Sequence, residues 1–339
     1  MNELRKGRQS IVFPNYPSIA ASAAVAGKKE GEGPLRADFD QIAADTKLGQ
    51  ASWEKAESML QKTAFELALE KASLACGDLD ILFAGDLLNQ CISSSFAARD
   101  TNLPFLGLYG ACSTMAESLL LAASFVNAGY AKRAAALTSS HFASAERQYR
   151  FPLGYGGQRT PTAQWTVTGA GALMLTSEGE GPYVTHVTTG RIFDAGVTDA
   201  NNMGAAMAPA AYETLKAHFA DTGRTPADYA AIITGDLGKI GHEILTDLFL
   251  RDGVDLGVCS TDCGMLIFNL ETQDVHAGGS GCGCSASVLC GHILQRMTCG
   301  DWPRVLFAAT GALMSPTTSQ QGESIPGICH AVVLDVNRG

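Results

Sequence analysis

Cys112 stands at the junction between an apolar segment and a helix-forming segment, a position at which enzymes can hold a nucleophile. Residues 104–109 (PFLGLY) are predicted to form a short buried strand, because they are apolar and are bounded by Pro and Gly. Ser113 and Thr114 supply hydroxyls for a helix start, and Thr114 together with Glu117 fits a capping box. Because a helix N-terminus presents unpaired N–H groups, it favours a thiolate or a bound anion. The alternative is that Cys112 is a small buried residue at a tight corner.

Basic and aromatic residues follow the next predicted strand, which ends at Ser139 and Ser140. In a layered α/β protein this loop is expected to open at the same mouth as Cys112. Its basic residues are His141, Arg147 and Arg150, with Arg159 nearby. Its aromatic residues are Phe142, Tyr149 and Phe151. His141 is the stronger candidate for a binding role because it directly follows the strand, whereas each arginine could instead pair with an acid at a subunit interface.

Further candidate ligands are two aspartates and four cysteines. Asp86 and Asp236 end equivalent predicted strands, where they would bind Ca²⁺ or, more commonly, cap the following helix. The cysteines are Cys259, Cys263, Cys282 and Cys284. Cys282 and Cys284 lack the two-residue gap that zinc sites usually show, so no metal site and no cofactor are predicted.

The composition indicates a protein with a large core and no nucleic-acid partner. The chain has 339 residues, of which 46% are hydrophobic and 17% are charged, and its net charge is −10. An acidic chain lacks the basic surface that nucleic acid or anionic lipid requires. Prolines interrupt the apolar start of the sequence, and no apolar run reaches a membrane-spanning length. Ten cysteines without an export signal indicate reduced thiols in a cytoplasm.

The sequence repeats the same pattern of elements twice. The segment ILFAGDL at 81–87 resembles AIITGDL at 231–237. A Gly-rich corner, a helix, a Gly stop, an Arg and a buried strand follow Gly110 and again follow Gly281. The shared order of these elements predicts that the protein is a duplicated α/β protein.

The alternation of strands and helices predicts mostly parallel sheets covered by helices, in an α-β-α-β-α layered fold. The first half is expected to span 1–180 and the second half 181–339. Helices are expected at 52–74, 206–220, 239–250 and 285–298. Strands are expected near 80–85, 105–109, 133–139, 165–176, 183–189, 230–235, 264–269, 304–309 and 328–336.

The order of these elements resembles the thiolase superfamily, which includes ketoacyl synthases. The resemblance rests on GDLLNQ and AARDTNLPFLGLYGACSTMAESL in the first half, and on GGSGCGCSASVL and GICHAVVLDV in the second. It covers most of the chain and implies a thiolase-like fold with Cys112 at the nucleophile position. Condensation also requires histidine or asparagine partners, but Asp236 and Cys282 occupy those positions. A degenerate, non-catalytic site is therefore expected. The alternatives are an acyl-CoA condensing or thioester-transfer enzyme that uses Cys112, and a purely structural subunit whose former active site is empty.

Within this superfamily the chain is similar to the stage V sporulation protein AD family of spore-forming bacteria. This resemblance rests on GLYGACSTMAES, on HFASAERQYRFPLGYGGQRTPTAQW and on TGALMSPTTSQQGESIPGICHAVVLD, and it runs over essentially the whole chain. It implies a subunit that binds dipicolinic acid (pyridine-2,6-dicarboxylate), with or without Ca²⁺. The subunit would belong to the SpoVA membrane channel complex, which moves dipicolinate into the forespore and releases it in germination.

The resemblance also implies a place in the cell, a subunit arrangement and a set of binding residues. The protein is expected on the cytoplasmic side of the forespore or spore inner membrane, attached peripherally through the other SpoVA proteins. A homodimer is expected to form through the strand near 103–110. A flat aromatic dianion requires N–H donors, cations and an apolar slot. The predicted ligand-binding residues are Cys112, Ser113, His141, Arg147, Arg159 and Asp236.

Overall fold

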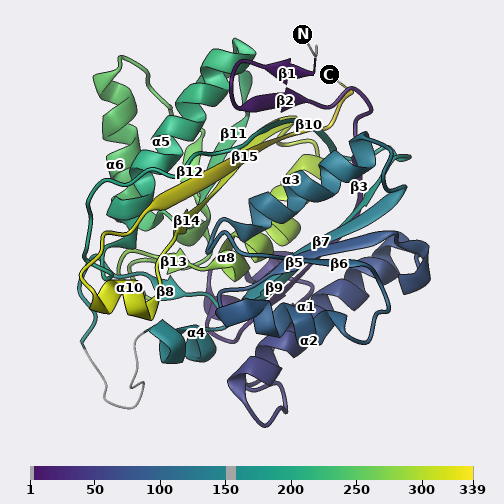
Figure 1. Ribbon diagram of the computed structural model, residues 1–339, viewed down its shortest axis with the longest axis horizontal. Coiled ribbons are helices and arrows are strands. Elements are labelled where there is room, and N and C mark those ends of the chain that lie inside the picture. Colours follow the sequence, from purple (N-terminus) through teal and green to yellow (C-terminus); the bar gives the residue numbers. More distant parts are fainter. Residues whose placement is uncertain (1–3, 150–157, 339) are drawn as a thin grey trace.

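The computed structural model describes residues 4–149 and 158–338, and its strands form two halves with the same order (Figure 1). The order across the first half is β3 (Ser18–Ala26), β9 (Gly169–Thr176), β7 (Arg133–Ser140), β5 (Ile81–Gly85) and β6 (Phe105–Leu108). The order across the second half is β10 (Tyr183–Thr188), β15 (Gly327–Asp335), β14 (Arg304–Ala312), β11 (Ala231–Gly235) and β12 (Ser260–Asp262). β3 pairs with β10 at Ser18 and Tyr183, which joins the halves.

Each half of the sheet mixes parallel and antiparallel pairs. In the first half β7, β5 and β6 are parallel to one another, and β9 lies antiparallel between β7 and β3. The second half repeats this pattern, with β14, β11 and β12 parallel and β15 antiparallel between β14 and β10. The expectation of mostly parallel sheets is therefore wrong, because each half adds an antiparallel strand beside its parallel core of three. The division of the chain at residues 180 and 181 stays a prediction.

Helices cover both outer faces of the sheet and fill the space between its halves (Figure 1). α1 (Trp53–Ala72) and α2 (Ile92–Ala98) pack on the first half. α5 (Met203–Thr222) packs on β14 and β15, with α6 (Gly238–Arg251) beside it. α3 (Thr114–Asn127) contacts β5 and β7 as well as β14 and β15, and α8 (Cys282–Ser287) contacts β7, β9 and β11. This α-β-α-β-α layering confirms the predicted duplicated, thiolase-like α/β fold class.

The remaining elements are short. The strands among them are β1 (Arg5–Lys6), β2 (Ser10–Val12), β4 (Gln41–Ile42), β8 (Trp165–Thr166) and β13 (Gly279–Ser280). The helices are α4 (Phe142–Tyr149), α7 (Cys263–Leu266), α9 (Leu294–Thr298), α10 (Pro316–Gln320) and the π-helix η7 (Val288–Ile293). The 3₁₀ turns are η1 (Glu30–Glu32), η2 (Arg36–Asp38), η3 (Cys76–Asp78), η4 (Asn89–Cys91) and η6 (Pro226–Asp228). Across residues 4–149 and 158–338, none of the helices combines the length and the apolar character needed to cross a membrane.

The predicted strand at 264–269 is wrong, because α7 begins directly after β12. The Asp262 carboxylate accepts hydrogen bonds from the N–H groups of Gly264 at 2.8 Å and of Gly238 at 2.9 Å. Asp262 thereby caps α7 and turns the chain out of the sheet. A short apolar run such as 264–269 fits a strand or a buried helix equally well, so its pattern alone could not decide.

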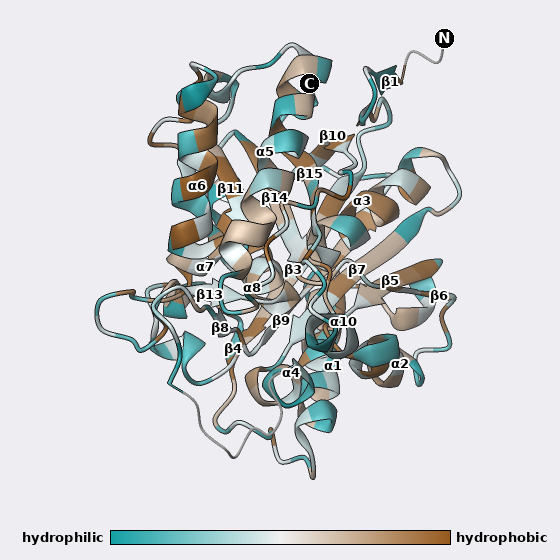
Figure 2. Cartoon of the chain, turned by 60° about the vertical axis from the view of Figure 1, so that its left-hand side comes forward, coloured by the Kyte–Doolittle hydropathy of each residue, from teal (hydrophilic) through white to brown (hydrophobic). Residues whose placement is uncertain are grey.

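Small residues allow the inner layers to pack closely. A Cβ atom on Gly171 of β9 would lie 2.4 Å from the carbonyl oxygen of Ala286 in α8, so only glycine admits the helix at this distance. The core between the halves of the sheet includes Phe83, Leu119 and Phe307. Figure 2 shows the apolar stretches on the strands and on the helix faces turned toward them.

Glu30 is a buried acid in η1 that ties this turn to the segment before β9. Its Oε1 atom accepts a hydrogen bond from the N–H of Thr168 at 2.9 Å. Burial raises the pKa of Glu30 to about 7, although the hydrogen bond from Thr168 opposes the shift. The folded protein therefore holds the Glu30 proton more tightly than the unfolded chain does.

We expect the free energy of unfolding to fall as the pH rises from 4.5 to about 7, because the unfolded chain releases the Glu30 proton first. Glu30 should account for roughly 3 kcal/mol of this fall. Glu30→Gln cannot titrate, so its stability should lack this part of the pH dependence. Urea unfolding of both proteins across this pH range, followed by circular dichroism, measures the difference. An equally steep decline in the variant would contradict the assignment.

Candidate functional site

The corner before α3 is held by hydroxyls that bond to the turn itself. Ala111 has a φ of 50°, a left-handed conformation that is unfavourable for a residue with a Cβ atom. The Ser113 hydroxyl donates to the carbonyl oxygen of Gly110 at 2.7 Å. The Thr114 hydroxyl donates to the carbonyl oxygen of Ala111 at 2.6 Å and accepts from the N–H of Gly110 at 3.0 Å. The predicted capping box is therefore wrong, because this turn uses the Thr114 hydroxyl that would have capped the helix.

Cys112 is buried at this corner, with its side chain in the thiol form. Burial is the main cause that raises the pKa of Cys112, and the nearby Asp236 adds to the shift. The N–H of Gly281 opposes both effects. Desolvation therefore opposes the thiolate that a helix start is expected to favour.

Cys112 lines a small cavity of about 60 Å³ that both halves of the chain enclose. The first half contributes Leu87, Tyr109, Ala111, Cys112, Ala145, Glu146, Tyr149 and Thr166. The second half contributes Ala200, Met203, Ser280, Ala312 and Met314. The wall is mostly apolar, and Glu146 is the acid on it. Among the described residues that line the cavity, none is Lys, Arg or His.

Two tyrosines and α4 shape one part of this wall. The Tyr149 hydroxyl donates to the carbonyl oxygen of Leu87 at 2.8 Å and lies 2.7 Å from the Tyr109 hydroxyl. Ala145, Glu146 and Tyr149 project from one face of α4 into the cavity. The hydroxyl pair thus connects α4 to the corner that carries Cys112.

Asp236 lies at the end of β11, close to Cys112 but outside the cavity lining. It is fully buried, and its φ of 72° is left-handed. Neither carboxyl oxygen accepts a well-oriented hydrogen bond from the part of the chain that the structure describes. Burial first, and Asp262 second, raise the pKa of Asp236 well above its usual range, while the Cys284 thiol opposes them. The Asp236 carboxyl is therefore a neutral, buried acid.

Cys282 begins α8 and packs beside Cys112. Both belong to one apolar cluster with Leu87 and Ala145. The Cys282 thiol donates to the carbonyl oxygen of Ser139 at 3.0 Å, and burial raises its pKa. Cys112, Asp236 and Cys282 thus meet in a buried region that favours the protonated form of each. A general base for the Cys112 thiol is not among these three.

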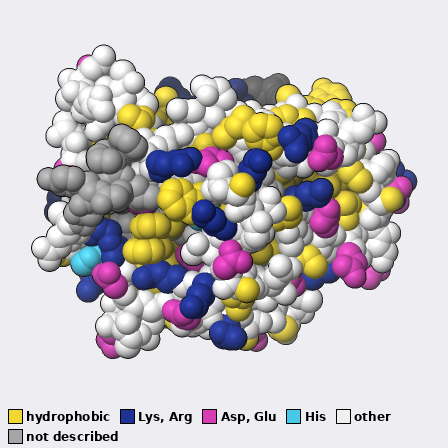
Figure 3. Space-filling view, turned by 90° about the horizontal axis from the view of Figure 1, so that it is seen from below, with side chains coloured by type: hydrophobic (Ala, Val, Ile, Leu, Met, Phe, Trp, Pro, Cys, Tyr) yellow, Lys and Arg dark blue, Asp and Glu magenta, His cyan; other side chains and the backbone are white. Residues whose placement is uncertain are grey.

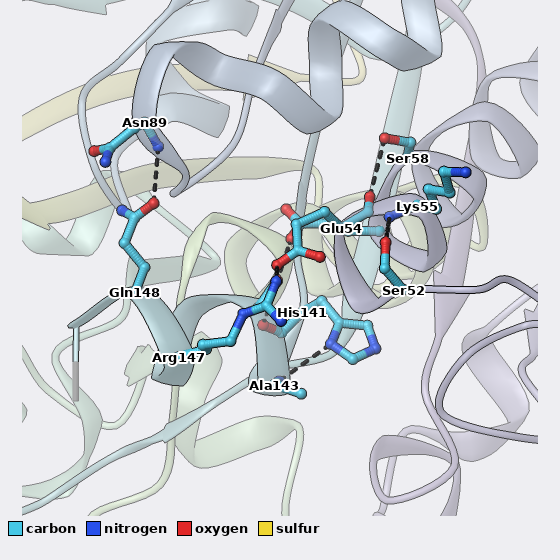
Figure 4. A network of polar contacts seen from close by, with 11 residues as sticks. Ser52, Glu54, Lys55, Ser58, Asn89, His141, Ala143, Arg147 and Gln148 are labelled. Carbon is cyan, nitrogen blue, oxygen red and sulfur yellow. Dashed lines mark hydrogen bonds and ion pairs between the residues drawn. The ribbon is translucent and has the colours of Figure 1, made fainter. Parts of the chain in front are cut away.

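The structure does not bring His141 to the cavity. His141 is buried, and its Nδ1 atom accepts a hydrogen bond from the N–H of Ala143 at 3.1 Å (Figure 4). Its Nε2 atom lies 2.7 Å from the carbonyl oxygen of Thr46 and donates to it, since Nδ1 carries the lone pair. Burial lowers the pKa of His141, so the ring is neutral and serves to position the start of α4.

The two predicted arginines that the structure describes pair with acids instead of facing the cavity. The Arg147 guanidinium forms an ion pair with Glu54 of α1 (Figure 4). It also lies 5.4 Å from the centre of the Trp53 ring. The Arg159 guanidinium pairs with Asp274 at 2.9 Å and stacks on Trp165. The expectation that these cations face the mouth of the cavity is therefore wrong.

The remaining predicted residues have separate outcomes. Ser113 is buried within the turn and does not line the cavity, because its hydroxyl bonds to Gly110. Arg150 and Phe151 lie outside the described residues. The helical repeat of α4 explains the rest, since it turns Ala145 and Tyr149 inward and Arg147 outward.

Two buried acids beneath α4 hold the cavity wall in place. Glu57 of α1 accepts hydrogen bonds from the hydroxyls of Ser144 at 2.6 Å and Ser139 at 3.2 Å. Asp86 accepts from the N–H of Leu88 at 2.8 Å and from the hydroxyl of Ser94 at 2.6 Å. Asp86 therefore caps the chain after β5. Within residues 4–149 and 158–338, no three His, Cys, Asp or Glu side chains are arranged to hold a metal ion.

Sequence reasoning missed Glu146, Tyr109 and the methionines at 203 and 314 as cavity residues. A signal for Glu146 was available, because it lies between Ala145 and Tyr149, which are one helical turn apart. Tyr109 ends the strand before the corner and could have been placed beside Cys112. Met203 begins α5 and Met314 lies in the loop after β14, and the positions of both depend on the packing of the second half.

The arrangement of strands and helices is a thiolase-like fold, with Cys112 at the corner before α3. Solved structures with this fold include 3-oxoacyl-[acyl-carrier-protein] synthase III from Aquifex aeolicus VF5, with a TM-score of 0.57 and 13% identity over 94% of this chain and 99% of that one. A single-residue variant of OleA from Xanthomonas campestris has a TM-score of 0.61 and 14% identity over 96% of this chain and 99% of that one. At these identities the similarity concerns the fold alone.

The particular family follows from the sequence itself. The profile of the Stage V sporulation protein AD (SpoVAD) family matches residues 7–335. The Stage V sporulation protein AD of Bacillus subtilis (strain 168) is 46% identical over 329 residues, which cover 97% of each chain. The chain therefore belongs to the stage V sporulation protein AD family.

Proposed function

We propose that this chain is a non-catalytic sporulation subunit that binds dipicolinic acid in the cavity beside Cys112. The observation that carries the proposal is that Cys112 lines a mostly apolar cavity as a neutral thiol, with Asp236 and Cys282 beside it as neutral groups. Such a site can enclose a flat ring without attacking it. Membership of the stage V sporulation protein AD family supports a role in spore formation.

The cavity offers two kinds of contact to a planar dicarboxylate. Tyr109 and Tyr149 supply aromatic rings, and the backbone N–H groups of Cys112 and Gly281 lie beside the Cys112 thiol. Glu146 would repel a free dianion. Ca²⁺ that enters with the ligand would offset the charge of Glu146 and of both ligand carboxylates, because carboxylates are the usual ligands of this ion.

The place of this subunit in the cell follows from the same proposal. It would act with the other SpoVA membrane proteins when dipicolinate enters the forespore and when it leaves during germination. We place the chain on the cytoplasmic side of the inner membrane, attached through those proteins. The net charge of −10 supports attachment through protein partners over direct binding to anionic lipid.

Calorimetric titration with dipicolinate, with and without Ca²⁺, tests the binding site. Cys112→Ala retains the backbone N–H groups, so we expect only a modest loss of affinity. Cys112→Asp adds a buried carboxyl against the ligand and should abolish binding. Thermal melts verify that both variants fold. If Cys112→Asp binds like the parent protein, the ligand does not occupy this cavity.

A second candidate function is acyl-CoA condensation or thioester transfer, which the fold and the position of Cys112 favour. We expect no turnover, since a neutral thiol without a base is a poor nucleophile. Release of free CoA from acetyl-CoA and malonyl-CoA, followed with a thiol reagent, measures the activity. Turnover that disappears in Cys112→Ala would establish the enzyme and overturn the non-catalytic proposal.

We also propose a homodimer through β6, the edge strand of the first half. Leu106 and Tyr109 are 44% and 42% exposed, which is unusual for apolar side chains on an unpaired edge. Beside this strand, the Oε2 atom of Glu117 is buried without a hydrogen-bond partner among the described residues. A second copy would cover the apolar side chains and offer donors to Glu117.

Light scattering at micromolar concentration tests this arrangement. The parent chain should have the mass of a dimer, and Leu106→Glu should give a monomer by placing a charge in the interface. Leu250→Glu, at an exposed position of α6, is the matched control and should stay dimeric. A monomeric parent chain refutes the proposal.

A further inference from the structure

A groove of about 250 Å³ lies between α1 and α2, apart from the cavity at Cys112. Met59 and Phe96 line it with apolar side chains, and Lys55, Lys62 and Arg99 line it with three cations against the single acid Asp100. Figure 3 shows Lys and Arg side chains around apolar ones on the underside of the molecule, the side to which α1 and α2 belong. The groove therefore combines an apolar contact with a basic border.

Phe96 is the exposed aromatic of this groove. Its side chain is 48% exposed although the rest of α2 is largely buried. The Arg99 guanidinium lies 5.0 Å from the centre of the Phe96 ring, one turn further along the helix. An exposed ring beside Met59 in a concave surface is the kind of position where a partner side chain gains most from burial.

The cations of the groove are weakly neutralised. The Nζ atom of Lys62 lies 3.9 Å from the Oε1 atom of Glu66, and the Nε atom of Arg99 lies 3.7 Å from the Oδ1 atom of Asp100. All four side chains are exposed to solvent, so these ion pairs are weak. Lys55 has no ion pair with any residue of the described ranges, and its ammonium points away from Glu54 (Figure 4). Basic lining in a chain with a net charge of −10 marks this groove as complementary to an acidic partner.

We propose that this groove binds an acidic amphipathic helix of another protein. Apolar side chains spaced three or four residues apart would insert beside Met59 and Phe96, and carboxylates on the flanks of the helix would pair with Lys55, Lys62 and Arg99. The net charge of −10 disfavours an anionic bilayer, and the few cations here are too sparse for nucleic acid. The inference does not depend on the ligand of the Cys112 cavity.

Site-specific photo-crosslinking in spore-forming cells identifies the occupant. We would place p-benzoylphenylalanine at Phe96 and, as the control, at Tyr130, which is 78% exposed after α3. The Phe96 probe should give a crosslinked peptide from another protein with net negative charge and helical apolar spacing. A lipid adduct, a peptide of this chain, a partner peptide without that chemistry, or yields no higher than at Tyr130 would refute the proposal.

Binding of the captured sequence as a synthetic peptide then tests the contacts. Phe96→Ala and the double variant Lys62→Glu/Arg99→Glu should each bind the peptide at least tenfold more weakly, by fluorescence anisotropy. Lys132→Glu, an exposed lysine elsewhere that pairs with Glu178, should bind unchanged. A peptide with its acids replaced by lysines should bind the double variant better than the parent chain. Unchanged affinity in Phe96→Ala, or no charge-swap rescue, overturns the assignment, and thermal melts report whether each variant folds.

Discussion

The close approach of α8 to the first half of the sheet determines where the start of α8 meets the start of α3. A Cβ atom on Gly283 would lie 2.4 Å from the carbonyl oxygen of Gly169, so the helix touches the backbone of β9 directly. The Ser140 hydroxyl, at the end of β7, accepts a hydrogen bond from the N–H of Gly283 at 3.0 Å. This contact places Cys282 beside Cys112. The cavity and the neutral groups behind it depend on this contact between the two halves.

Burial gives the site its chemical character. In thiolase-like enzymes the nucleophile works because a base and hydrogen-bond donors act on it. Here desolvation raises the pKa of Cys112, Asp236 and Cys282 together, and each like-charged neighbour would add to the cost of ionising another. Three neutral groups of this kind provide no ready nucleophile. Of the three, Cys112 lines the cavity, where its neutral thiol can contact a ring without reacting with it.

The sequence predicted the long periodic elements well because their signal is local. The helix expected at 52–74 appears as α1, and the duplicated order of elements reappears in the order of strands across the two halves. Placing Cys112 at a helix start needed only the strand and the helix around it. Predicting that its thiol stays protonated required knowledge of how deeply Cys112 is buried, and this burial depends on packing from the other half.

The sequence was least informative where side chains choose between partners. Arg147 and Arg159 could face a ligand or an acid, and Glu54 and Asp274 lie within reach only once the chain has folded. Thr114 could cap its helix or bond to the turn before it, and the left-handed conformation of Ala111 selected the turn. Which partner a side chain takes depends on contacts formed only when the chain folds, so a local sequence pattern cannot predict it.

α1 connects the cavity wall with the groove on the outer surface, because its inner face bonds to the elements behind the cavity and its outer face lines the groove. On the inner face, Glu57 holds Ser144 of α4, and the Gln61 amide donates to the carbonyl oxygen of Gly85 at 3.1 Å. On the outer face, Lys55 and Lys62 point into the groove. Buried hydrogen bonds to acids and amides are costly to break, so they fix the position of the helix. A partner that docks on the outer face therefore meets a surface that is already ordered, and loses less conformational entropy on binding.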